Sequence, residues 1–81
     1  MRQGRRTINR EDRAMATLIE TLTDLDSNNT IKNVLLFDSE LAAYQAIVNK
    51  TAVAENAGFH VAEFDPMLLI SCDVLIEYQV I

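Results

Sequence analysis

Five arginines are the most concentrated chemistry in the 81-residue sequence. They lie within residues 1–14, where only Glu11 and Asp12 oppose them, so five positive and two negative charges give this segment a net charge of +3. Guanidinium groups bind phosphates or carboxylates through paired hydrogen bonds. The candidate interaction residues are therefore Arg2, Arg5, Arg6, Arg10 and Arg13. The alternatives for this segment are a solvated tail or an upstream extension of the compact domain.

Three other side chains have the chemistry for catalysis if the fold brings them together. Asp38 follows an apolar run, where α/β enzymes often place a nucleophile or a metal ligand. His60 and Cys72 are the single histidine and the single cysteine, so they are the one possible nucleophile–base pair of this type. Each also has a structural interpretation, which we favour: a helix cap, a partly exposed strand residue and a small buried hydrophobe, respectively.

Cofactor and metal sites lack the residues that they need. The two glycines, Gly4 and Gly58, are too few for a loop that surrounds a phosphate with backbone N–H groups. A structural zinc site takes about four cysteine or histidine ligands, more than the chain contains. The carboxylates are scattered, without the regular spacing of a calcium-binding loop. We therefore expect no cofactor and no bound metal.

The composition favours association with another protein chain. Hydrophobic residues make up 49% of the sequence, and a chain of this length has little interior in which to bury them. A single cysteine excludes an intrachain disulfide and suits a reducing compartment. We therefore expect a homo-oligomer or an obligate partner.

Location and charge narrow the partners further. No signal peptide is visible, and the most apolar run, residues 67–81, contains Asp73 and Glu77 and is too short to cross a membrane. We expect an intracellular protein, either cytoplasmic or within a virion, without membrane contact. Residues 15–81 carry ten carboxylates against two lysines, a net charge of −8. This charge repels a phosphate backbone, so nucleic-acid binding is restricted to the basic arm.

The first half of the chain reads as helix, strand and helix. Apolar residues recur at helical spacing over residues 15–25, which predicts a first helix. Residues 31–37 are β-rich and end in a continuous apolar run, typical of a strand covered on both faces. A second helix over residues 40–57 is predicted between an N-cap at Asp38 or Ser39 and a C-terminal Gly58.

That second helix has two sides and one competitor. Its polar side carries Gln45, Asn49 and Asn56, and another side carries the apolar residues Leu41, Tyr44, Val48 and Ala52. The competing interpretation is a hairpin that pairs residues 44–48 with residues 51–54. It is disfavoured because the connecting Asn49-Lys50 lacks the glycine of a tight turn.

The second half reads as strands. Residues 59–64 form a strand candidate, and Asp65-Pro66 predicts a turn. Residues 74–81 alternate with period two, which predicts a strand whose core face holds Val74, Ile76, Tyr78 and Val80. Residues 67–70 either extend this last strand or form a short turn of helix.

Together these patterns predict one α+β domain over residues 15–81, preceded by a basic arm over residues 1–14. The expected architecture is a mixed or antiparallel sheet of about three strands packed by two helices. The favoured function is a non-enzymatic assembly subunit, viral or from another multi-subunit complex, whose arm contacts neighbouring chains. The alternatives are an acidic regulator or inhibitor that covers a basic surface of another protein, and an enzyme that uses Asp38, His60 or Cys72.

Overall fold

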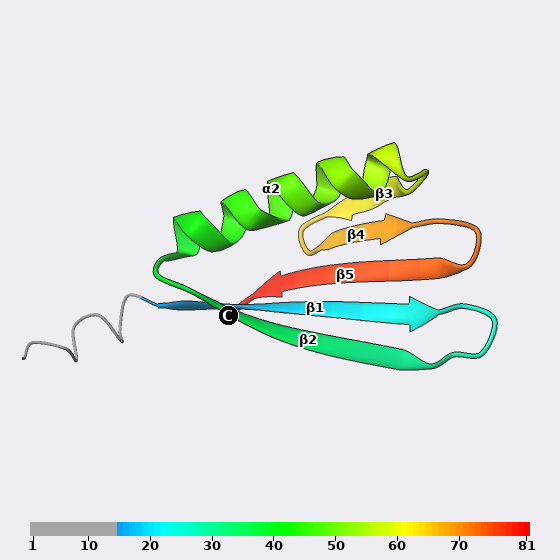
Figure 1. Cartoon of the computed structure of the whole chain (residues 1–81), viewed down its shortest axis with the longest axis horizontal. Helices are drawn as coiled ribbons and strands as arrows, with labels where there is room; N and C mark the ends of the chain where they lie inside the picture. Colours follow the sequence, from blue (N-terminus) through cyan, green and yellow to red (C-terminus); the bar gives the residue numbers. More distant parts are fainter. Residues whose placement is uncertain (1–14) are drawn as a thin grey trace, which may run out of the picture.

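The computed structural model describes residues 15–81, which form one antiparallel sheet of five strands and one long helix (Figure 1). The elements follow in the order β1 (Ala16–Asp24), β2 (Thr30–Phe37), α2 (Glu40–Asn56), β3 (His60–Phe64), β4 (Met67–Ile70) and β5 (Val74–Val80). In space the strand order is β2-β1-β5-β4-β3. The β1–β2 hairpin and the β3–β4–β5 meander therefore join through the antiparallel β1–β5 pair.

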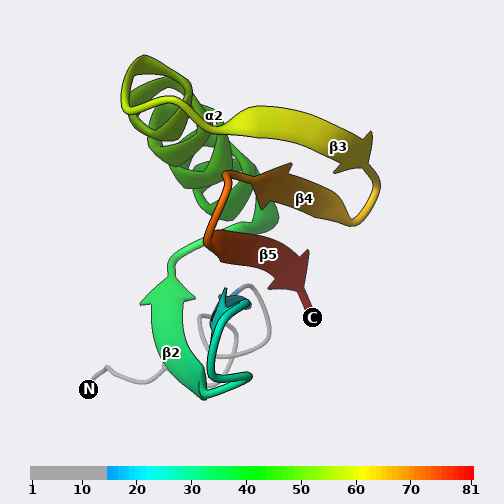
Figure 2. The same cartoon turned by 90° about the vertical axis from the view of Figure 1, so that its right-hand side faces the viewer.

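The expected fold class is wrong in its element count. The sheet has five strands rather than about three, and the described residues contain one helix rather than two. The helix lies over one face of the sheet, nearer to the β3–β4 side than to β2, as the two orthogonal views show (Figures 1 and 2). The opposite face of the sheet is not covered by any element of the described chain.

The predicted first helix is strand β1. Two of the apolar residues at helical spacing, Leu18 and Leu22, also fit a period of two with Ala16, because Ala16 and Leu18 are buried on the helix-facing side and Leu22 packs beside the core. Threonines lie between them, at Thr17, Thr21 and Thr23. Branched side chains favour extended backbone, and β1 pairs on both sides, with β2 and with β5. Tertiary pairing therefore outweighs the helical spacing.

The predicted strand at residues 31–37 is confirmed as β2, but the expectation that both its faces are covered is wrong. β2 is an outer strand of the sheet, and most of its residues are exposed. The apolar run that resembles a buried central strand therefore lies at an edge.

The second helix is confirmed as α2, and the competing hairpin is wrong. The Ser39 hydroxyl accepts a hydrogen bond of 3.1 Å from the Ala42 N–H, so Ser39 rather than Asp38 is the N-cap. After the C-cap Ala57, Gly58 takes a φ of 103°, a conformation that favours glycine. Neither sequence-defined side of the helix faces the sheet, because its buried residues are Ala43, Ile47 and Ala54.

The C-terminal strands follow the predictions more closely. The strand candidate is β3, and the residues of the Asp65-Pro66 turn connect it to β4. Residues 67–70 are a separate strand that pairs with both β3 and β5, so both interpretations offered for them are wrong. The core face predicted for the last strand is confirmed: Ile76 and Tyr78 are buried, and Val74 and Val80 pack against them.

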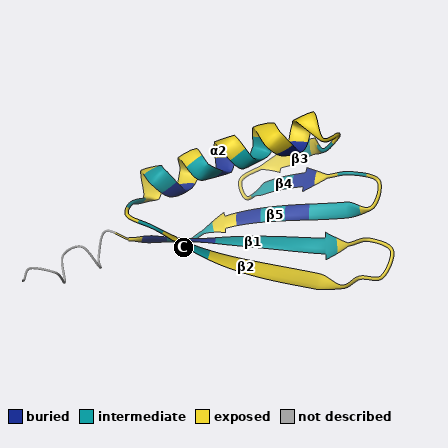
Figure 3. Cartoon of the chain, viewed as in Figure 1, coloured by how far each residue is buried: buried dark blue, intermediate teal, exposed yellow. Residues whose placement is uncertain are grey.

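The core is thin and lies between α2 and the middle of the sheet (Figure 3). Leu18 of β1 and Leu69 of β4 are fully buried, and Ile47 of α2 packs with them. Much apolar surface remains outside this core, including large side chains on β2 and on α2. These uncovered apolar surfaces are therefore the candidate interaction surfaces.

Candidate interaction surfaces

The structure separates the three candidate catalytic residues. Asp38 is exposed between β2 and α2, beside the end of the sheet where Ala16 pairs with Phe37. His60 begins β3, and Cys72 lies in the β4–β5 turn at the other end of β5. Asp38 therefore cannot act with His60 and Cys72.

His60 and Cys72 do share a surface groove of about 620 Å³ between the end of α2 and the β4–β5 turn. Both residues are exposed, so Cys72 is not the buried hydrophobe that we expected. In the described residues no hydrogen bond joins them, and Asp73 in the same groove bonds to Ser71 instead. The geometry gives no sign of an activated thiol.

The five arginines of the predicted arm lie outside the described residues. Within residues 15–81, no group of three or more histidine, cysteine, aspartate or glutamate side chains is placed to hold a metal ion. The helix of this part of the chain is too short and too polar to span a membrane.

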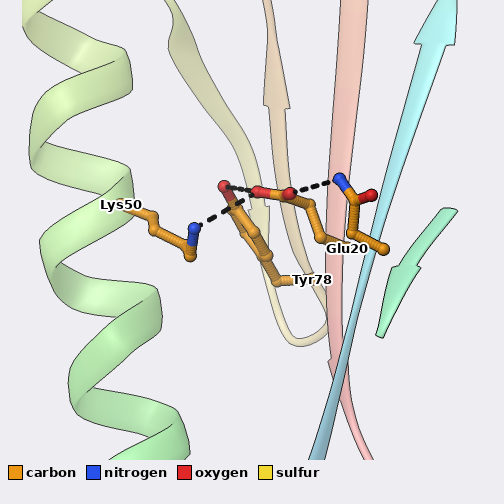
Figure 4. Close-up of polar contacts among 4 residues, drawn as sticks. Glu20, Lys50 and Tyr78 are labelled. Atoms are coloured by element: carbon orange, nitrogen blue, oxygen red, sulfur yellow. Dashed lines mark hydrogen bonds and ion pairs between the residues drawn. The ribbon is translucent and has the colours of Figure 1, made fainter. Parts of the chain in front are cut away.

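A polar cluster that the sequence did not reveal connects four elements around Glu20 (Figure 4). Tyr78 of β5 donates its hydroxyl to Glu20 Oε2 at 2.7 Å, and Asn33 of β2 donates its amide to Oε1 at 3.0 Å. Lys50 of α2 places Nζ 3.7 Å from Oε2. Only 13% of the Glu20 side chain is exposed, so the cluster holds a nearly buried carboxylate.

The surroundings shift the pKa values of both main members. Burial alone raises the pKa of Glu20, but the hydrogen bonds from Asn33 and Tyr78 and the charge of Lys50 together bring it below its ordinary value. For Tyr78, burial raises the pKa, and the hydrogen bond to the negative Glu20 raises it further. At neutral pH the cluster is therefore a carboxylate held by a protonated tyrosine.

This arrangement suits a structural anchor rather than catalysis. The tyrosine keeps its proton, and the carboxylate is engaged on both oxygens, so neither is free to exchange protons with a substrate. Through these contacts the Glu20 carboxylate of β1 links β2, β5 and α2. The one signal in the sequence is Glu20, which falls on the core-facing side when its segment is treated as a strand with period two.

The first uncovered surface is the outer edge of β2. On it Ile31, Val34 and Leu36 are exposed by 61%, 63% and 64%. Thr17 and Ile81 exchange two backbone bonds, so the odd-numbered residues of β1 bond to β5 and the even-numbered ones to β2. The bond from the Asp24 N–H to the Asn29 carbonyl, 2.8 Å long, agrees with this alternation.

The alternation decides which β2 backbone groups are free. Residues 31, 33, 35 and 37 lie opposite even-numbered residues of β1, so their N–H and carbonyl groups point toward β1. The residues between them direct their backbone groups to the outer edge: Thr30, Lys32, Val34 and Leu36. No other strand of the described chain meets this edge.

The second uncovered surface is an apolar side of α2 and the groove beside it. Leu41, Tyr44 and Val48 follow one another along the helix and are exposed by 68%, 53% and 67%. Tyr44 and Val48 line a groove of about 340 Å³ that also reaches Phe64 and Asp65 at the β3–β4 turn. The apolar residues that we read from the sequence as one side of the helix therefore face away from the core.

The chain matches no protein-family model, and neither the curated proteins nor the solved structures contain a match. The functional conclusion therefore depends on the two surfaces alone.

Proposed function

We propose that this protein is a non-enzymatic assembly subunit that pairs with a second copy through the outer edge of β2. The observation that supports this proposal is an eight-residue outer strand with exposed apolar side chains, whose outward backbone groups pair with no other strand of residues 15–81. Such an edge is a template for pairing with another strand.

Two-fold symmetry gives one antiparallel register that uses the whole edge. When Asn33 faces Asn33 of the second copy, Thr30 lies opposite Leu36, and Lys32 lies opposite Val34. Every outward backbone group of β2 then has a partner, and only the last residue, Phe37, extends past the partner strand. Side chains opposite each other point to the same face, so Ile31 of one copy meets Leu35 of the other beside the existing core.

Charge favours this edge over the rest of the surface. Residues 15–81 carry a net charge of −8, which makes two copies repel each other at most orientations. β2 contains none of the ten carboxylates, and its one charged residue is Lys32. The edge is therefore the long apolar surface that two copies can bring together without opposing acidic groups.

The test is the replacement of Val34 by proline. Because the Val34 N–H points outward, Val34→Pro removes no bond within the chain, but it removes a donor from the proposed pairing. We expect the native mass to fall from 18.2 kDa, twice 9.1 kDa, to 9.1 kDa at micromolar concentration. The measurement is light scattering after size exclusion, at about 0.5 M salt to screen contacts of the basic arm.

The matched control is Val34→Thr, which keeps the branched side chain and the backbone N–H. It should retain the mass of the wild-type protein. Circular dichroism of both variants should match that of the wild-type protein, because the side chain of Val34 lies outside the core. A monomeric wild-type protein, or a dimer that Val34→Pro leaves intact, would contradict the proposal. A monomer would instead favour an acidic regulator that binds a foreign protein.

A further inference from the structure

We propose that residues 5–13 of a second copy bind the groove between α2 and the β3–β4 turn. The inference deepens the proposed function, because it names the partner of the basic arm within the same assembly. It concerns a surface different from the β2 edge, so the two proposals can fail separately.

The groove combines apolar walls with a negative rim. Its inner side is formed by Ile47 and Met67, and Tyr44 and Phe64 stand at its mouth, with Phe64 exposed by 79%. Asp65, an exposed acidic residue, also lines it. The groove therefore offers burial for an apolar side chain, two aromatic faces for cations and one acidic group.

No cation of the described chain lies in this groove. Residues 15–81 contain two basic side chains. Lys50 pairs with Glu20, and Lys32 lies on β2 at the far edge of the sheet. Glu40 adds a second carboxylate nearby, one helical turn before Tyr44. The uncompensated charge at this end of α2 is therefore negative.

One segment of the chain has the complementary chemistry. Residues 5–13 contain four arginines and a single apolar side chain, Ile8. An extended peptide places alternate side chains on the same side, so Arg6, Ile8 and Arg10 form a cation–apolar–cation pattern. Ile8 fits the apolar interior, while the flanking guanidinium groups meet the aromatic faces and Asp65. Charge complementarity thus selects this segment over an apolar helix or strand.

The experiment measures binding of a fluorescent peptide of residues 5–13 to the full chain. The receptor carries Arg6→Gln and Arg10→Gln, so that its own arm does not compete, and Val34→Pro, so that sheet pairing does not contribute. We expect saturable binding by fluorescence anisotropy. Phe64→Ser in the receptor, or Ile8→Ser in the peptide, should weaken it roughly tenfold. Asp65→Asn should weaken it roughly two- to fivefold.

The matched control is Asp26→Asn, which removes the same charge from the exposed β1–β2 turn at the other end of the sheet. It should leave the affinity unchanged. Equal losses from Asp65→Asn and Asp26→Asn would reduce the effect to overall charge and overturn the inference, as would absence of binding. Phe64 is outside the core, so unchanged circular dichroism of Phe64→Ser keeps the test independent of folding.

A final measurement identifies the molecule that supplies the arm. When the receptor carries its wild-type arm, the arm of a second copy should compete with the labelled peptide for the groove. This competition should become stronger as the protein concentration rises. A block that is complete at every concentration would show that the arm binds its own groove, and would overturn the assignment to a second copy. Binding of the peptide with no effect of Val34→Pro on native mass would refute the proposed sheet pairing alone.

Discussion

The two outer strands of the sheet, β2 and β3, differ in every feature that controls pairing at an edge. β3 has five residues, its register shifts between Val61 and Glu63, and it carries an acidic side chain. β2 has eight residues, pairs with β1 without a shift, and carries one lysine. Bulges, short length and charge are the means by which proteins prevent edge pairing. Within residues 15–81, the β3 edge is therefore protected and the β2 edge is open.

The comparison indicates that the exposed apolar residues of β2 are not merely a consequence of a small core. If they were, both edges should be similarly unprotected. The same sheet instead shows that its sequence can protect an edge where pairing is unwanted. The difference therefore favours a specific partner for β2, and three further measurements test how far it holds.

The largest effect is expected from β5, which joins the half of the sheet that contains β2 to the half that contains β3. Ile76 is buried in the core, so Ile76→Asp buries an unpaired charge and should cost about 3–5 kcal/mol, comparable with the whole stability of a small domain. We expect loss of the cooperative melt in circular dichroism. Gln79→Asp, at an exposed position, should melt like the wild-type protein. Equal behaviour of the two variants would be inconsistent with this register.

A lysine should have a larger effect on association at the open edge than at the protected one. Leu36→Lys places a charge on the exposed side of β2 and, in the proposed register, beside the partner strand. We expect the dimer dissociation constant in analytical ultracentrifugation to rise about tenfold or more. Ala62→Lys on β3 should leave the constant unchanged. If the β3 variant weakens the dimer as strongly, the difference between the edges does not determine pairing.

The smallest effect is expected at the Glu20 cluster, which adds one side-chain hydrogen bond to the pairing of β2 with β1. Glu20→Gln removes the ion pair with Lys50 and weakens two hydrogen bonds, so it should lower the free energy of unfolding by about 1 kcal/mol at neutral pH. Because the folded pKa of Glu20 is lowered, its stabilisation is complete above the ordinary value of 4.5 and is lost as pH falls through the folded pKa.

The pH dependence gives this third measurement its control. The difference in melting temperature between the wild-type protein and Glu20→Gln should shrink as the pH falls from 6 to about 3. Glu77→Gln changes a carboxylate on the opposite face of the sheet, where no bond to the cluster exists, and should show a smaller difference. A Glu20→Gln difference that stays constant over this pH range would show that the carboxylate charge contributes nothing.

The sequence predicted the elements that local chemistry determines. Local contacts within a few residues determine the Ser39 cap, the Gly58 terminus and the Asp65-Pro66 turn. The strict alternation over residues 74–81 fits a strand and no other element. The helix predicted over residues 15–25 was wrong because Leu18 and Leu22 fit the spacing of a strand as well as that of a helix, and pairing with β2 and β5 decides between them. The pairing with β5 depends on residues fifty or more positions away, which no local pattern contains.

The interaction surfaces were harder to predict for the same reason. An apolar run such as Val34-Leu35-Leu36-Phe37 is typical of a central strand, and only the strand order shows that it lies at an edge. The apolar side of α2 was visible in the sequence, but the residues that α2 buries against the sheet are Ala43, Ile47 and Ala54. The Glu20 cluster needed the register of three strands, since 58 positions separate Glu20 from Tyr78.

The β1–β5 pair also has a consequence for the kinetics of folding. The β1–β2 hairpin and the β3–β4–β5 meander have local contacts and can form on the microsecond timescale. Their union must close a loop of nearly sixty residues, which makes it the slow, entropically costly step. Until it occurs, the inner edge of β1 is unpaired and can accept β5 of another newly made chain. High concentration during refolding should therefore favour exchange of whole hairpins between molecules, a domain-swapped product.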